Sequence, residues 1–188
     1  MINLYNIFHF LFVKWKHITT IWFIIISLII LLVCFIIKIR FSLSLRKTVE
    51  LFIMMEYLFL VLLSTVFTRR ILEAPRSELS LLWSYRWGYK LYGWRKVIIE
   101  NCINIILLVP IAILLLRINQ NRNRYRFVAM VGFAISLCIE LLQFILCRGT
   151  FELDDLLHNM IGVALVIIVN ATIIKIQNRR TQNEQASI

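Results

Sequence analysis

The sequence contains few residues that interrupt regular structure and few acidic residues. Its 188 residues include five glycines and two prolines, and ten Asp and Glu stand against 21 Lys and Arg, which gives a net charge of +11. Hydrophobic residues make up 61% of the chain. A chain this short and this apolar is hard to fold as a soluble domain, so the composition indicates a polytopic membrane protein.

The excess of basic residues does not indicate nucleic-acid binding. Lys and Arg lie almost entirely between the apolar runs, whereas binding to phosphate backbones would need an accessible basic surface. Basic residues beside apolar runs fix membrane topology and meet anionic headgroups. We therefore expect membrane lipids, and no nucleic acid, as partners.

The chain has no Cys-x-x-Cys pair. Its four cysteines, Cys34, Cys102, Cys138 and Cys147, lie in or at the ends of apolar runs. We interpret them as small buried hydrophobic residues, and we expect neither a metal site nor a cofactor. No small-residue cleavage site follows the first apolar run, which is therefore expected to be a retained helix.

Five apolar segments are expected to cross the membrane: residues 18–37, 51–67, 97–116 and 127–147, and a fifth that ends near Ile174. The first has 20 residues, which at about 1.5 Å per residue matches a hydrocarbon core of about 30 Å. The predicted fold is an all-α transmembrane bundle. An interfacial segment over 1–17 precedes two spans and an aromatic, basic loop over 18–96; a three-span core over 97–174 precedes a polar tail over 175–188, which we expect to fray.

Polar residues recur inside the third and fourth spans. Asn104 lies in the third span, where Pro110 removes a backbone donor and predicts a kink at mid-depth. In the fourth span, Ser136, Glu140 and Gln143 follow a spacing of i, i+4 and i+7, which places them on one helix face. Because polar groups are costly in hydrocarbon, these residues are candidates for a functional site.

A second polar face is predicted at the start of the fifth span. Asp155, His158, Asn159 and Gly162 are spaced i, i+3, i+4 and i+7, and only a short acidic connector separates them from the fourth span. Consecutive elements joined so closely are usually neighbours, so the two polar faces should lie near each other. Arg148 is the expected cation for Glu140, the buried carboxylate of the fourth span, and a cation from another helix is the alternative. Glu152, Asp154 and Asp155, at the end of the connector and in the first turn of the fifth span, also suit an ordinary helix start.

Two further features have two interpretations each. Glu56, within the second span, is either an interfacial or paired carboxylate or a functional one. The segment 68–96 interleaves Trp and Tyr with Arg and Lys, which is typical of an aromatic belt at the headgroup zone. The same segment could instead grip a lipid headgroup or an amphiphilic ligand.

The polar pattern resembles the VanZ-like membrane proteins over roughly Glu100 to Val169. The matching stretches are Asn104 to Pro110, Ser136, Glu140 to Phe144, Arg148, Phe151 to Asp155, and Asn159 to Gly162. The chain departs from many relatives at Ala112, where they have Gly, and at Glu152, where they have Asp. The resemblance implies that the binding residues are Asn104, Glu140, Gln143, Arg148, Asp155 and Asn159, with Pro110 and Gly162 structural.

The founding member of that family is associated with low-level resistance to teicoplanin, an acylated glycopeptide. The resemblance implies a protein of the bacterial envelope that handles a lipid-linked or amphiphilic molecule. A membrane-embedded transferase or hydrolase acting on a lipid headgroup is the alternative, with His158 and the carboxylates as acid and base. No nucleophile lies beside a base at a recognisable spacing. The polar residues could also be interhelical glue, and transport has the least support because no inverted repeat is visible.

The density of Lys and Arg in the loops predicts the orientation. Short basic connections at residues 38–50 and 117–126 and the tail from Lys175 favour the cytoplasm under the positive-inside rule. The aromatic segment 68–96 and the acidic connector 148–155 would then lie outside, with the N-terminus outside and the C-terminus inside.

Overall fold

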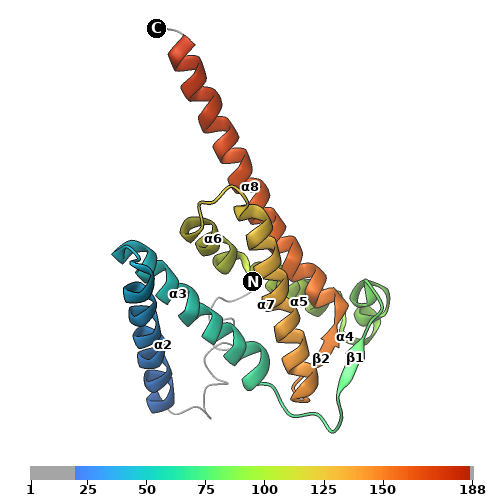
Figure 1. Cartoon of the computed structure of the whole chain (residues 1–188). Coiled ribbons are helices and arrows are strands. Elements are labelled where there is room, and N and C mark those ends of the chain that lie inside the picture. Colours follow the sequence, from blue (N-terminus) through green and yellow to red (C-terminus); the bar gives the residue numbers. More distant parts are fainter. Residues whose placement is uncertain (1–19, 187–188) are drawn as a thin grey trace. The chain divides into compact units, whose positions relative to one another are not determined.

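The computed structural model describes residues 20–186, and most of them are helical (Figure 1). The helices are α2 (Thr20–Phe41), α3 (Leu45–Leu62), α4 (Tyr89–Tyr92), α5 (Trp94–Leu107), α6 (Val109–Ile118), α7 (Arg124–Ile145) and α8 (Leu153–Ala186), with π-helical turns η2 (Leu63–Phe67) and η3 (Ser84–Gly88). The predicted all-α class is confirmed. The interfacial segment predicted over residues 1–17 lies outside the described residues.

Within residues 20–186, five helical stretches are long and apolar enough to cross a membrane. They are Trp22–Phe41, Leu45–Phe67, Trp94–Ile118, Arg124–Ile145 and Leu153–Asn183. Their number matches the five predicted spans, and many of their large apolar side chains face outward, Trp22, Leu28 and Met130 among them. An outward apolar surface of this kind suits lipid rather than water. Acyl chains are as apolar as Leu, so no hydrophobic driving force buries these side chains in a membrane.

The described chain forms two compact units. The first contains the segment up to Ser77 together with Leu141–Phe151, and the second contains Glu78–Glu140 and Glu152 onward. The long helix α7 therefore contributes its last turn to the first unit and the rest of its length to the second.

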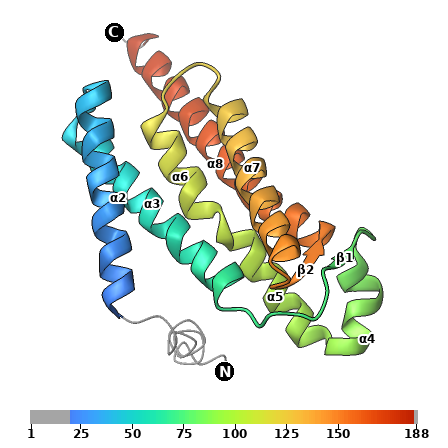
Figure 2. The ribbon, with the colours of Figure 1, turned by 60° about the horizontal axis from the view of Figure 1, so that its bottom comes forward.

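In the first unit, α2 and α3 lie side by side (Figure 2). The rings of Phe23 and Phe59 are 5.7 Å apart between centroids. Deeper in the pair, the Ser27 hydroxyl donates to Glu56 Oε2 at 3.1 Å, while Glu56 Oε1 is buried without a hydrogen-bond partner among the described residues. The carboxylate of Glu56 is thus turned toward the neighbouring helix.

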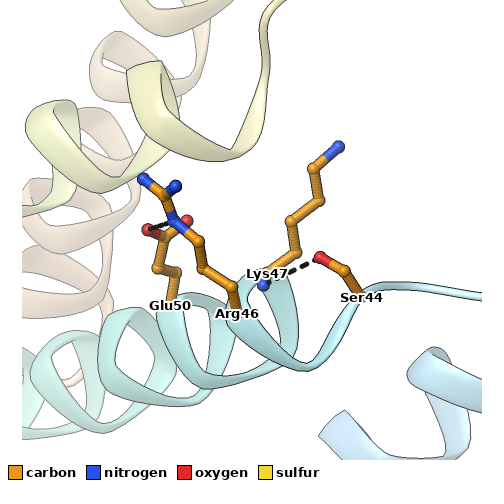
Figure 3. Close-up of polar contacts among 4 residues, drawn as sticks. All are labelled: Ser44, Arg46, Lys47 and Glu50. Carbon is orange, nitrogen blue, oxygen red and sulfur yellow. Dashed lines mark hydrogen bonds and ion pairs between the residues drawn. The ribbon is translucent and has the colours of Figure 1, made fainter.

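The connection between α2 and α3 is shorter than the loop predicted over residues 38–50. Helix α3 already begins at Leu45, because Ser44 caps it by accepting a hydrogen bond from the Lys47 backbone N–H at 3.4 Å (Figure 3). Arg46 Nε then pairs with Glu50 Oε1 at 3.2 Å across one helical turn. The charged residues that suggested a loop are therefore helical: Lys38 and Arg40 lie in the last turn of α2, and Arg46, Lys47 and Glu50 lie in the first turns of α3.

The first unit also holds most of the two short strands, β1 (Arg76–Glu78) and β2 (Thr150–Glu152), which pair in a two-stranded sheet. These strands were not predicted, because three residues are too few to show an alternating pattern. Just before β2, Cys147 has a positive φ of 53°, and its carbonyl accepts from Leu72 N at 2.6 Å.

In the second unit, the third span is interrupted at Leu108, where α5 ends and α6 begins. Pro110 lies in the first turn of α6, a position that tolerates its missing N–H. The kink predicted from this proline is confirmed. Beside the interruption, α8 approaches so closely that a Cβ on Gly162 would overlap the Ile105 carbonyl oxygen.

Helix α8 packs along α5 and α6 and extends far beyond the expected end of the fifth span near Ile174. The residues from Lys175 onward were expected to fray, yet the structure keeps them helical as far as Ala186. This stretch contains Lys, Arg, Gln and Glu, which are good helix formers once an apolar segment has nucleated the helix.

Candidate functional site

Buried polar side chains of the second unit gather where α8 begins. The buried ones are Ser84, Asn101, Ser136, Glu140, Asp154, His158 and Asn159. They come from the 82–85 segment, α5, α7 and α8. Because a polar group without partners is costly to bury, their hydrogen bonds show what each one does.

Asp154 is fully buried and accepts three hydrogen bonds from the aromatic segment. The backbone N–H groups of Leu82 and Ser84 donate to its two carboxylate oxygens at 2.5 and 3.0 Å, and the Ser84 hydroxyl donates at 2.7 Å. Asn101 Nδ2 in turn approaches the Ser84 hydroxyl at 3.4 Å. Asp154 therefore fixes the aromatic segment to the first turn of α8, where the helix dipole also favours a negative charge.

Glu140 and Glu152 extend this hydrogen-bond network. Trp83 Nε1 donates to Glu152 Oε2 at 2.9 Å, and the Glu152 backbone N–H donates to Glu140 Oε2 at 3.0 Å. Nearby, hydrogen bonds from the side chain and the backbone N–H of Ser80 lower the pKa of Glu78, which lies outside the spans. Acidic groups are thus held at this end of α8 by indole, hydroxyl and backbone donors.

Tyr85 and His158 form a polar pair beside Asp154. The His158 Nδ1 atom lies 2.6 Å from the Asp154 carbonyl oxygen, and its Nε2 lies 2.9 Å from the Tyr85 hydroxyl. A carbonyl only accepts, so Nδ1 carries the proton. In the neutral imidazole, Nε2 consequently accepts from the Tyr85 hydroxyl.

Two asparagines connect the helices of the second unit. Asn104 Nδ2 donates to Asp155 Oδ1 at 2.5 Å, and Asn159 Nδ2 donates to the Ser136 hydroxyl at 2.9 Å. The Asn159 Oδ1 atom is buried and has no hydrogen-bond partner within residues 20–186. The structure thus brings four of the six predicted binding residues, Asn104, Glu140, Asp155 and Asn159, into one unit.

The other two predicted binding residues belong to the first unit. Gln143 Oε1 lies 3.4 Å from Arg69 Nη1, and its Nε2 donates to the Thr65 carbonyl at 3.2 Å. Arg148, the cation expected for Glu140, donates to the carbonyls of Phe67 and Arg69.

A protein-family model described as VanZ/LLP1 matches residues 20–174. The chain belongs to the VanZ/LLP1 family. The matched region contains the first four candidate spans, most of the fifth, and every residue of the polar network described above. No curated protein and no solved structure shows significant similarity to the chain.

The candidate site contains residues that were not assigned to it from the sequence. Asp154 was interpreted as helix-start chemistry, and Ser84 was not singled out. One signal was present, because Asp154 and His158 are four residues apart and share a helix face. Nothing in the sequence indicated the partners in the aromatic segment, about 70 residues earlier. Among the described residues, no group of three His, Cys, Asp or Glu side chains could hold a metal ion.

Proposed function

We propose that this VanZ/LLP1 protein binds the polar headgroup of an amphiphilic or lipid-linked envelope molecule at the start of α8. The observation that carries the proposal is the pairing of a buried network with partly exposed polar groups: Asp154 and His158 are buried, whereas Tyr85 is 37% exposed and Asp155 is partly exposed. Rigid buried groups that orient accessible ones are a general feature of binding sites.

The aromatic segment supplies a surface suited to an amphiphile. Trp87 and Tyr92 are 60% and 52% exposed, and Lys90 Nζ lies 4.5 Å from the Trp87 ring centroid. Rings and ammonium groups placed together favour the boundary between headgroups and acyl chains. With the predicted orientation, this surface would meet envelope molecules at the outer face, and binding there would lower susceptibility to an acylated glycopeptide.

The test compares the minimum inhibitory concentrations of teicoplanin and vancomycin in a susceptible Gram-positive host. The host expresses wild type, Asp155→Asn, Glu140→Gln or the control Glu100→Gln at matched membrane levels. Glu100 is half exposed and makes only a surface pair with Lys96 at 3.7 Å, so its loss should change little. We expect a rise for teicoplanin with wild type and with the control, and loss of that rise with the other two variants.

A different result would reject the link to resistance. If wild type raises neither minimum inhibitory concentration, this member does not act on glycopeptide susceptibility. If Asp155→Asn and Glu140→Gln cannot be brought to the wild-type membrane level, the polar residues hold the fold together and do not form a binding site.

The Tyr85–His158 pair gives specific support to a second function, an enzyme acting on a lipid headgroup. A tyrosine hydroxyl that is hydrogen-bonded to an imidazole of fixed tautomer can transfer a proton to or from a substrate. Profiling of host lipids by mass spectrometry tests this function. Wild type should create or remove a lipid species, and Tyr85→Phe, which removes only the hydroxyl, should abolish that change.

A further inference from the structure

An apolar groove lies between α6 and α8 in the second unit, away from the start of α8. It encloses about 360 Å³ and is lined by Val109, Ile113, Leu116, Arg117, Leu165, Val166, Val169, Asn170 and Ile173. On α8, the lining positions run from Leu165 to Ile173, which is about 12 Å of helix at about 1.5 Å per residue. The groove is therefore nearly as long as half of the roughly 30 Å hydrocarbon core.

Polar and basic groups gather at one end of this groove. Arg117 lies in the last turn of α6, and the Tyr125 hydroxyl donates to Asn170 Oδ1 at 3.2 Å. Arg124 Nη2 donates to the same hydroxyl at 3.2 Å. A shallow depression follows, lined by Arg122, Asn123, Tyr125 and Arg126. The Tyr125–Asn170 hydrogen bond therefore links a lining residue of the groove to the connection between α6 and α7.

That connection carries charge of one sign only. Residues 117–126 include Arg117, Arg122, Arg124 and Arg126, and they contain no Asp or Glu. Guanidinium groups match phosphate geometry with paired N–H donors, and an arginine near an anionic membrane surface contributes measurably to attraction. The groove has an apolar lining nearly one leaflet long and arginines at one end. This arrangement complements the acyl chain and the phosphate of a phospholipid.

We propose that this groove binds one anionic phospholipid of the bilayer, with an acyl chain between α6 and α8 and the phosphate at the 117–126 connection. The site is separate from the network at the start of α8 and does not depend on the function proposed there. Charge complementarity favours an anionic headgroup over a zwitterionic one. The apolar lining favours a membrane lipid over a free phosphate.

The first experiment measures lipid binding to the purified full-length chain by native mass spectrometry. Phosphatidylglycerol and phosphatidylcholine with identical acyl chains are the probes, and inorganic phosphate is a third. We expect one phosphatidylglycerol to bind at least about tenfold more tightly than phosphatidylcholine, with no retained phosphate. Equal affinity for the two lipids, or phosphate retained without lipid, would overturn the proposal without any variant being needed.

Matched variants then locate the site. Arg117→Gln with Arg124→Gln should weaken phosphatidylglycerol binding by about fivefold per arginine, whereas Arg179→Gln with Arg180→Gln removes the same charge farther along α8 and should leave binding unchanged. Val169→Trp fills the groove and should abolish binding. Ile168→Trp, one residue away and outside the lining, should not. Equal effects within either pair would show that the lipid does not bind at this groove and would reject it as the site.

Discussion

Asp154 is the side chain whose truncation should disturb the second unit most. Asp154→Ala would leave three donors from Leu82 and Ser84 without their acceptor, and each unsatisfied buried donor costs about 1–3 kcal/mol. Leu82 also has a positive φ of 60°, a conformation that a bulky residue keeps only when its surroundings hold it. We expect segment 82–85 to detach from α8, which hydrogen exchange of its amides in detergent would detect as a loss of protection.

The control for this variant is Glu100→Ala. It removes a carboxylate of the same unit whose surface ion pair with Lys96 is worth at most about 1 kcal/mol, so protection of segment 82–85 should stay at the wild-type level. Unchanged exchange in Asp154→Ala would show that the hydrogen bonds to Asp154 do not hold the segment. It would also remove the main support for a preorganised headgroup site.

The contact between helices α5 and α8 depends on Gly162. A methyl group there would overlap the Ile105 carbonyl oxygen, and backbone atoms, unlike a flexible side chain, cannot turn aside. Gly162→Ala should therefore force the helices apart and cost about 1–3 kcal/mol or more. The measurement is the thermal unfolding midpoint in detergent. Gly88→Ala is the matched control, because its added methyl would meet Trp83 at an ordinary 3.4 Å and the midpoint should stay close to wild type.

The sequence was enough to predict which polar residues share a helix face. It predicted the hydrogen-bond partners of those residues only in part. The spacing of Ser136 with Glu140, and of His158 and Asn159 with Asp155, follows from 3.6 residues per turn. The structure buries Ser136, Glu140, His158 and Asn159 in one unit. Arg148 was predicted as a partner of Glu140, whereas the hydrogen bond from the Glu152 N–H to Glu140 was not predicted. Periodicity states which residues share a face, but hydrogen bonds across a sequence separation of about 70 residues leave no periodic signal.

The whole chain has one property on which the proposed function depends, its orientation in the membrane. Lys and Arg favour the connections at 38–50 and 117–126 and the end of α8 in the cytoplasm. Cysteine labelling tests this in a variant whose native cysteines are replaced by serine. Ser80→Cys should react with a membrane-impermeant maleimide in intact cells, whereas Asn121→Cys and Gln182→Cys should react only after lysis. All three positions are exposed, so accessibility to the reagent alone will not separate them.

The labelling pattern also decides which function the network at the start of α8 can perform. Reaction of Ser80→Cys in intact cells would place the aromatic segment and Asp155 where an extracellular glycopeptide can reach them. The reverse pattern would place them in the cytoplasm, out of reach of teicoplanin, and would reject direct binding of the drug. It would also place the 117–126 arginines at the outer leaflet. The anionic phospholipid of the α6–α8 groove would then have to come from that leaflet. The two proposed sites lie at opposite ends of the predicted spans, so one experiment assigns a leaflet to each.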